Sequence, residues 1–286
     1  MRHDDTFSTY LARWDLTPDG DPVVTPTSRL QPVRHRGEPA MLKVATEDEE
    51  RWGAGLLAWW AGDGAVRVLE HHGDAVLMER ATGPRSLAAM ARRDEAGDDE
   101  ATRILCAVAA RLHATDVRPS PPALTPLDRW FVALAPGAER HGDRHPLLQN
   151  AAETARDLLA DPGSHAASPV VPLHGDLHHD NVLDAGPRGW LAIDPKRLGG
   201  EGAFDHANLF RNPDHPLAPN GVTATRTGRL ARRADIVSQA AHLDRDRLLR
   251  WVIALCGLSA VWYLDDGLDP AADLAVAELA LIELRR

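Results

Sequence analysis

The chain has 286 residues, 44% of them hydrophobic, and a formal net charge of −10 at pH 7. This length and apolar content suffice for one large core or two unequal ones. The acidic balance argues against a nucleic acid partner, because nucleic acids select basic surfaces. It favours cationic ligands wherever carboxylates gather locally.

The chain ends and the apolar runs predict no contact with a membrane. Residues 1–5 contain no apolar stretch typical of a secretory signal. The longest apolar run, 251–264, is too short to span a bilayer and predicts a buried helix. Cys106 and Cys256 lie in apolar, helix-like surroundings that are typical of reduced structural thiols. We therefore expect a cytoplasmic protein, and a monomer.

The N-terminal part of the sequence predicts a small antiparallel sheet. Segments 21–24, 29–35 and 39–44 alternate or run apolar, and turn residues separate the last two at 36–39. A further apolar strand at 75–78 leads into residues 79–84, which are rich in helix and strand breakers. This arrangement is typical of a sheet that ends in a connection to a second lobe.

Lys43 lies in an apolar strand, where an unpaired ammonium group would be costly. The acidic run 47–50 that follows opens a helix whose inward positions are spaced four and three apart, starting at Glu50. Glu50 is therefore the predicted partner of Lys43. Glu49 is its competitor, and the other carboxylates of the run are expected to stay solvated.

Beyond residue 85 the sequence pattern becomes helical. Apolar residues recur at intervals of three and four between 104 and 112 and define one buried face. We therefore predict an α+β fold with two lobes. Residues 1–80 form the small antiparallel sheet lobe, residues 81–286 form a larger and mainly helical lobe, and the hinge lies near 78–84.

The residues with the clearest chemical signal follow short strands in the second lobe. The segment LHGDLHHDNV at 173–182 places Asp176 five residues before Asn181, and the apolar run 191–193 ends at Asp194. Transfer of a γ-phosphoryl group needs a carboxylate facing the acceptor hydroxyl and oxygen ligands that hold magnesium against the nucleotide phosphates. Asp176 suits the first role, and Asn181 and Asp194 suit the second.

A hydrolase interpretation of the same segment stays open. It uses five side chains as metal ligands: His174, Asp176, His178, His179 and Asp180. Two adjacent histidines in an extended loop cannot easily aim both rings at one ion, and this interpretation leaves Asn181 and Asp194 without a role. Taken alone, His174 is typical of a packed, hydrogen-bonded core histidine that orients the loop.

On these residues the chain resembles the aminoglycoside phosphotransferase family, whose members carry HGDxxxxN followed by ID. Segments 173–183, 189–196 and 204–210 look like the streptomycin 6-phosphotransferases and related aminoglycoside/hydroxyurea resistance kinases, and the likeness includes 39–43 and 64–69. The resemblance implies a bilobal, protein-kinase-like fold that uses ATP and Mg²⁺. It also implies a small cationic antibiotic as acceptor, with streptomycin phosphorylated at its 6-position. The alternatives are another small acceptor, such as hydroxyurea or an amino sugar, or a pseudokinase that only binds nucleotide.

The resemblance also implies which residues meet the nucleotide. Lys43 would contact the α and β phosphates, oriented by Glu50. The backbone of Glu79 and Ala81 would bond adenine, although a plain connection between the lobes is the alternative. Residues 25–28 would cover the phosphates.

That covering loop contains no glycine, unlike the glycine-rich loop of protein kinases. Hydroxyl groups would replace the glycine backbone, so that Thr27 and Ser28 donate to phosphate. An ordinary β-turn is the alternative. Asp205 is expected to cap a helix that begins near His206 and to brace the catalytic loop.

The acceptor would lie between the catalytic loop and the C-terminal helices. Carboxylates there would pair with guanidinium groups, and a tryptophan would stack on them. The candidate residues are Glu201, Asp214, Trp262, Asp265 and Asp266. Solvated loop positions are the alternative for the last two aspartates.

Overall fold

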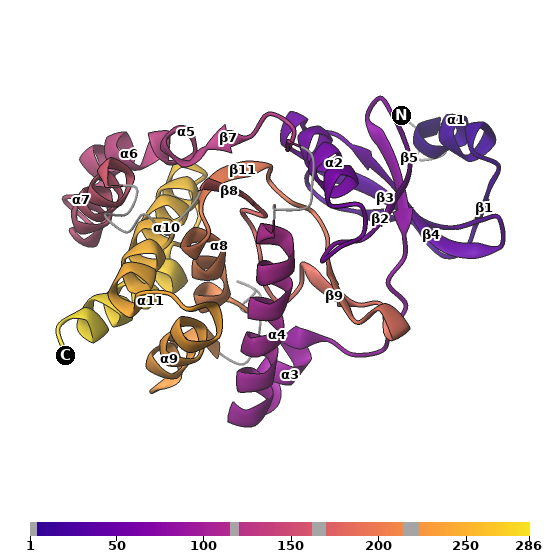
Figure 1. The fold of residues 1–286 in the computed structure, drawn as a ribbon. Helices are drawn as coiled ribbons and strands as arrows, with labels where there is room; N and C mark the ends of the chain where they lie inside the picture. The colour runs from indigo at the N-terminus through magenta and orange to yellow at the C-terminus, as the bar shows by residue number, and fades with distance from the viewer. Residues whose placement is uncertain (1–4, 115–119, 162–169, 214–222) are drawn as a thin grey trace.

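The computed structural model describes residues 5–114, 120–161, 170–213 and 223–286, with the backbone alone at residues 5, 48–50 and 223. The chain is an α+β protein. A small antiparallel sheet with two helices lies at one end, and a larger, mainly helical part lies at the other (Figure 1). The predicted boundary between residues 80 and 81 stays a prediction.

The N-terminal sheet is antiparallel throughout, in the order β1-β3-β4-β6-β5, with β2 against β3. Arg36 and Gly37, both with positive φ (53° and 85°), form the two-residue turn between β3 and β4 at the position that the sequence predicts. The strands have these bounds: β1 Leu16–Pro18, β2 Val23–Val24, β3 Ser28–His35, β4 Glu38–Ala45, β5 Val68–His72 and β6 Ala75–Glu79.

The two faces of this sheet have different partners, because successive side chains of a strand point to opposite faces. Leu42 and Leu77 pack with Phe7 of helix α1 (Asp5–Arg13) in a core of their own. Val76, on the other face, belongs to the main core of the protein. That face is also the one that carries Lys43.

Helix α2 (Asp48–Trp60) joins the sheet part to the main core. Trp60 is fully buried, and its Nε1 donates to the carbonyl oxygen of Leu112 at 2.9 Å. Residues just after α2 continue the attachment, since Val66 N donates to Ala192 O at 3.0 Å and Ala192 N donates to Gly64 O at 2.9 Å. The packing of α2 is therefore shared with the larger part.

The larger part contains helices around three short ladders of strands. Its α-helices are α3 Leu87–Arg93, α4 Glu95–His113, α5 Leu127–Trp130, α6 Leu134–His141, α7 Leu147–Ala160, α8 Ala203–Ala207, α9 Arg229–Ala241, α10 Arg245–Asp265 and α11 Ala271–Leu284. Its strands are β7 Thr125–Pro126, β8 Val170–Leu173, β9 Val182–Asp184, β10 Trp190–Ala192 and β11 Leu198–Glu201. Its 3₁₀ helices are η1 Phe131–Ala133, η2 Gly186–Arg188, η3 Asn208–Arg211 and η4 Thr223–Thr225. The predicted apolar face at 104–112 is confirmed, because its residues pack into the main core.

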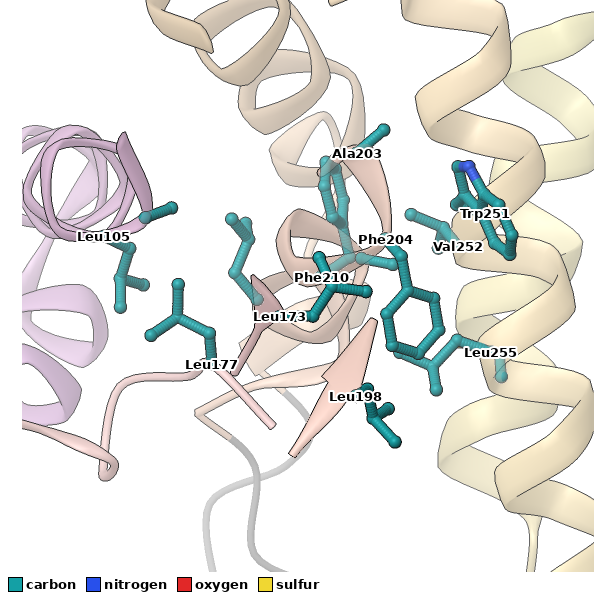
Figure 2. Close-up of a cluster of buried hydrophobic side chains, with 14 of the residues drawn as sticks. Leu105, Leu173, Leu177, Leu198, Ala203, Phe204, Phe210, Trp251, Val252 and Leu255 are labelled. Atoms are coloured by element: carbon teal, nitrogen blue, oxygen red, sulfur yellow. The ribbon is translucent and has the colours of Figure 1, made fainter. Parts of the chain in front are cut away.

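The main core fixes the start and the middle of the loop that follows β8. Leu173 and Leu177 point into the same cluster as Phe204 and the α10 residue Trp251 (Figure 2). Phe204 packs edge-on against Trp251, with ring centroids 5.5 Å apart and planes at 81°. Burying apolar side chains on both sides of a loop leaves its polar residues little freedom. The core thus positions residues 174–181.

Helix α10 is long and apolar enough to cross a membrane, but 72% of its most apolar window is buried inside the protein. This burial is typical of the central helix of a globular core, as the sequence predicts. Cys106 and Cys256 are both buried and unpaired. Their predicted role as structural thiols is confirmed.

Hydrogen bonds to Asp184 hold the connection after β6 against strand β9. Gly83 N donates to the Asp184 carbonyl oxygen at 2.8 Å, and Arg85 Nε and Nη2 donate to its carboxylate at 2.8 and 3.2 Å. A Cβ atom at Gly83 would lie 2.2 Å from Asp184 Cγ. Only glycine therefore allows the chain to pass this close to the buried carboxylate.

We expect Asp184→Asn to lower the melting temperature by several degrees at neutral pH and by less in acid. The hydrogen bond from Arg85 lowers the pKa of Asp184 from 3.8 to about 2. A carboxylate with a depressed pKa stabilises the fold above its unfolded pKa and loses this effect as the pH falls through its folded pKa. Thermal unfolding from pH 7 to pH 2 measures the gap in melting temperature between the wild type and Asp184→Asn.

The gap should be constant above pH 4 and close between pH 4 and pH 2. Asp143→Asn, at an exposed position between α6 and α7, is the control and should leave the melting temperature unchanged. A gap that stayed constant down to pH 2 would contradict the role of the Asp184 charge.

Candidate functional site

A buried carboxylate holds the start of the loop that joins β8 to β9. Asp205 is 1% exposed and accepts hydrogen bonds from His174 N at 2.8 Å, Gly175 N at 2.7 Å and His113 Nε2 at 2.8 Å. Burial acts to raise the pKa of Asp205, but the hydrogen bond from His113 and the neighbouring charges lower it overall. The predicted bracing of the loop is confirmed. The predicted helix cap is wrong, because Asp205 lies inside α8 and Gly202 precedes that helix.

His174 orients the loop and the segment that follows β10 at the same time. Its Nε2 bonds Ile193 O at 2.7 Å, and its Nδ1 accepts from Asp176 N at 3.2 Å. The ring is fully buried and lies nearly parallel to Trp60, with centroids 6.3 Å apart. Burial lowers the pKa of His174, which keeps the ring neutral. The prediction of a packed core histidine is confirmed.

The other two histidines of the loop do not converge with it on one point. His178 Nδ1 accepts from Asp180 N at 3.2 Å. His179 is buried, and within the described part of the chain neither of its ring nitrogens has a hydrogen-bond partner. Burial together with Arg233 lowers its pKa well below the ordinary value. Because each ring has a different environment, this geometry gives the hydrolase interpretation no shared metal position.

Asp176 presents a carboxylate whose two oxygens are held by two different amides. Asn208 Nδ2 donates to Oδ1 at 2.7 Å, and Asn181 Nδ2 donates to Oδ2 at 3.1 Å. Burial acts to raise the pKa of Asp176, but His178, whose Nε2 lies 3.7 Å from Oδ1, and the charge of Lys196 lower it overall. The side chain is 32% exposed. An ionised, fixed and accessible carboxylate is what a proton-accepting group requires.

Asp194 lies directly across from Lys43. The Lys43 Nζ atom is 2.8 Å from Asp194 Oδ1, and the two side chains are 7% and 30% exposed. The expected strand end is slightly displaced, since β10 ends at Ala192 and Asp194 has a φ of 59°. Aspartate is among the few non-glycine residues enriched in this left-handed conformation. The turn aims its carboxylate at the lysine.

The backbone brings the two predicted magnesium ligands close together. Ile193, which directly precedes Asp194, donates from its backbone N to Asn181 O at 2.9 Å. Asn181 directs its amide nitrogen to Asp176, so its side-chain oxygen faces elsewhere. One amide oxygen and one carboxylate suit Mg²⁺, which takes one or two protein ligands together with nucleotide phosphates. The donor set therefore fits the predicted metal.

The predicted partner of Lys43 is not tested, because the side chain of Glu50 lies outside the described residues. The loop before β3 forms a hydrogen-bonded turn. Ser28 N donates to Thr25 Oγ1 at 3.0 Å, and Thr46 N donates to Thr27 O at 2.9 Å. Thr25 N also donates to Ser28 O at 3.0 Å, so the loop is a tight connection between β2 and β3. Phosphate contacts from Thr27 and Ser28 stay predictions.

The predicted adenine contacts also stay predictions. Glu79 uses its carboxylate to bind Arg188 and to accept from Arg67 N at 2.6 Å. Its backbone N donates to Arg67 O at 3.0 Å. Ala81 lies half-buried in the connection after β6. Both residues lie where the chain passes from the sheet to the helical part.

A cavity of about 370 Å³ opens beside Asp176. Trp130 and Trp262 form an aromatic corner in it, with ring centroids 5.4 Å apart and planes at 81°. Its described lining residues are Trp130, Gly175, Asp176, Lys196, Asn208, Arg211, Leu255 and Trp262. The structure thus brings Trp262, a predicted acceptor residue, together with the catalytic candidate.

The predicted acceptor carboxylates that the structure describes are not among these lining residues. Glu201 is bound by Arg247 Nε and Nη2 at 2.7 and 2.6 Å. Asp265 accepts from Arg140 at 2.6 Å and from His141 at 2.9 Å. The other two are Asp266, which follows α10, and Asp214, which lies outside the described residues.

Sequence reasoning missed Trp130, Asn208 and Arg211. Arg211 is held in the cavity wall by Asp273, whose carboxylate oxygens lie 2.7 and 3.0 Å from Nε and Nη2. A signal existed, because Asp205, Asn208 and Arg211 are spaced by three and share one face of a helical turn. Trp130 carried no such signal.

The chain is similar to known resistance kinases over nearly its whole length. A family model described as "Aminoglycoside/hydroxyurea antibiotic resistance kinase" matches residues 13–267. A streptomycin 3''-kinase of Klebsiella pneumoniae is 48% identical, covering 94% of this chain and 98% of that protein. A streptomycin 6-kinase of Streptomyces griseus is 34% identical, covering 93% and 85%.

A solved structure shares the fold. It is a thermostable mutant of aminoglycoside phosphotransferase APH(4)-Ia in a ternary complex with ADP and hygromycin B. The TM-score is 0.62 at 14% identity, over 96% of this chain and 97% of that one. At this identity the likeness concerns the fold alone. The predicted bilobal, kinase-like fold is confirmed.

Two glycines of α2 give a matched test of how this helix supports Asp194. A Cβ atom at Gly53 would lie 2.4 Å from Pro195 O, whereas a Cβ atom at Gly55 would meet nothing within 4 Å. Gly53→Ala should destabilise the protein by about 1–3 kcal/mol and raise the KM for nucleotide, because α2 must move away from the segment after Asp194. Urea unfolding and steady-state kinetics measure both effects.

Gly55→Ala is the control and should stabilise the protein by up to about 1 kcal/mol, as alanine favours a helix over glycine. Its KM for nucleotide should not change. If both variants had the same free energy of unfolding and the same KM for nucleotide, the contact with Pro195 would have no structural consequence.

Proposed function

Because this chain belongs to the aminoglycoside/hydroxyurea antibiotic resistance kinases, we propose that it transfers the γ-phosphoryl group of ATP to a hydroxyl group of streptomycin. The chain is a phosphotransferase with a hydroxyl acceptor. One observation supports the proposal for its site: Asn181, which is bonded to Asp176, directly precedes β9, and Asp194, which is paired with Lys43, follows β10, the strand that pairs with β9.

Asp176 acts on the acceptor hydroxyl. The hydroxyl oxygen forms a bond to the γ-phosphorus while the bond from that phosphorus to the β–γ bridging oxygen breaks, so that ADP leaves. The proton of the hydroxyl passes to the Asp176 carboxylate. Because two amides already fix this carboxylate, little reorganisation is needed when the acceptor arrives.

Lys43 and Asp194 form the nucleotide side of the site. Lys43 exchanges part of its contact with Asp194 for the α and β phosphates, and its buried position keeps the ammonium group oriented. Asp194 and Asn181 would hold magnesium. When bound, the metal supplies positive charge that offsets the charge developing between the β and γ phosphates.

The cavity next to Asp176 would receive the acceptor. Its aromatic corner offers flat, apolar faces for a sugar or guanidinium group, and Asp176 supplies negative charge. The predicted acceptor position is the 6-hydroxyl, the one named for the Streptomyces griseus relative. The 3''-hydroxyl is the second candidate, since the relative at 48% identity is named for it. We also propose that the protein acts as a monomer in the cytoplasm, where ATP is abundant.

We expect Asp176→Asn to lower kcat by about a hundred- to ten-thousand-fold while leaving the affinity for ATP unchanged. The substitution keeps the shape of the side chain and removes its ability to take a proton, together with one of the two hydrogen bonds that it accepts from Asn181 and Asn208. Asp194→Ala should instead weaken binding of magnesium and ATP by about tenfold or more. Steady-state kinetics and nucleotide titration with and without magnesium separate the two effects. Near-normal turnover of Asp176→Asn would remove its assigned role.

Mass spectrometry of streptomycin after incubation with enzyme, ATP and magnesium tests the proposed acceptor. We expect the mass to rise by one phosphate, and NMR of the product then distinguishes the 6-hydroxyl from the 3''-hydroxyl. Hydroxyurea and simple amino sugars are the comparison acceptors. If ADP release responds to one of them and streptomycin stays unmodified, the acceptor proposal is wrong and the phosphotransferase chemistry stands.

A further inference from the structure

The two oxygens of the Asp176 carboxylate face different parts of the site. Oδ2 is held by Asn181, which we assign to the metal. Oδ1 is held by Asn208, which lines the cavity assigned to the acceptor. The oxygen on the Asn208 side is therefore the one closer to the incoming hydroxyl.

We propose that Asn208 is a positioning residue of the transfer reaction, a proposal that rests on the function given above. Its amide nitrogen holds Asp176 Oδ1 at 2.7 Å and occupies one side of that oxygen. His178 Nε2 lies 3.7 Å from the same oxygen, and the acceptor hydroxyl would approach Oδ1 on the side that these two groups leave open. Without this bond the carboxylate rotates about its side-chain torsions, and the proton-accepting oxygen loses its place.

The environment of Asn208 shows that its donor group is what matters. The residue is 4% exposed, and its Oδ1 atom is buried without a hydrogen-bond partner among the residues that the structure describes. A buried carbonyl oxygen without a partner carries a free-energy cost. Turning the amide over would place this oxygen against the Asp176 carboxylate, where the two would repel. The side chain is thus kept in the one orientation that donates to Asp176.

The backbone of Asn208 is fixed well enough for this role. Asn208 opens helix η3, whose next two residues, Leu209 and Phe210, are each 1% exposed. Phe210 points into the same apolar cluster as Leu173 (Figure 2). Asn212 Nδ2 also donates to Asn208 O at 3.0 Å. One packed core therefore holds both Asn208 and the loop that carries Asp176.

A double-mutant cycle with Asp176→Asn tests this proposal. Asn208→Ala alone should lower kcat by about ten- to a hundredfold, with less than about a twofold change in the KM for ATP. In the Asp176→Asn background the same change should lower kcat by less than about twofold, because residues that act as a unit are not additive. Full additivity of the two losses would overturn the proposal, since it would mean that Asn208 acts independently of Asp176.

Asn208→Asp is the second variant, in case Asn208→Ala does not fold. It keeps the shape and removes the donor, so it should lose kcat at least as strongly as Asn208→Ala. Wild-type turnover in Asn208→Asp would also overturn the proposal, because shape alone would then suffice. Asn150→Asp, at an exposed position of α7, controls for the added charge and should keep wild-type kcat.

The readout of the cycle is acceptor-stimulated ADP release, measured with the acceptor that the wild-type enzyme uses. If the proposed acceptor is wrong, the wild-type enzyme will release no additional ADP when streptomycin is added. This is measured before any variant is made. Absence of acceptor-stimulated ADP release in the wild type would refute the proposed function itself. An additive cycle with an active wild type would refute only the role of Asn208.

Discussion

One buried carboxylate supports the site as a whole. Asp205 accepts both amide hydrogens at the start of the catalytic loop, from His174 and Gly175, and it is itself held by His113. A loop with no regular hydrogen bonds of its own needs such an acceptor, because buried N–H groups without partners are costly. The position of Asp176 depends on this contact, and the acceptor and metal sides of the site depend on Asp176.

The sequence predicted the fold, and it indicated the candidate catalytic residues, because both signals are local. Alternating strands, the turn at residues 36–37 and the apolar face at 104–112 follow from neighbouring residues, and all are present. Asp176, Asn181 and Asp194 were recognisable because phosphoryl transfer needs fixed residue types close together in the chain. Lys43 was recognisable because a cation in an apolar strand needs a partner.

The partners themselves were harder to predict, because they come from distant parts of the chain. The contact of Lys43 with Asp194, 151 residues away in the sequence, was not predicted, while its predicted pairing with Glu50 stays a prediction. The acceptor carboxylates were chosen for their charge, but Glu201 and Asp265 already neutralise Arg247 and Arg140. Trp130 and Asn208 became visible only when packing placed them beside Asp176. Pairing is a property of the tertiary structure, which a residue type does not reveal.

The contacts of α2 determine where the sheet could move relative to the larger part. Gly53 brings this helix against Pro195, and Trp60 fixes its end to the main core. The N-terminal strands contribute one face to that core and the other face to the separate core that they share with α1. The helix α2 is therefore fixed to the same core as the loop that carries Asp176. If the β-strands moved relative to α2 and the loop after β10, the salt bridge between Lys43 and Asp194 would have to break. This ion pair therefore holds the sheet in its position against the larger part.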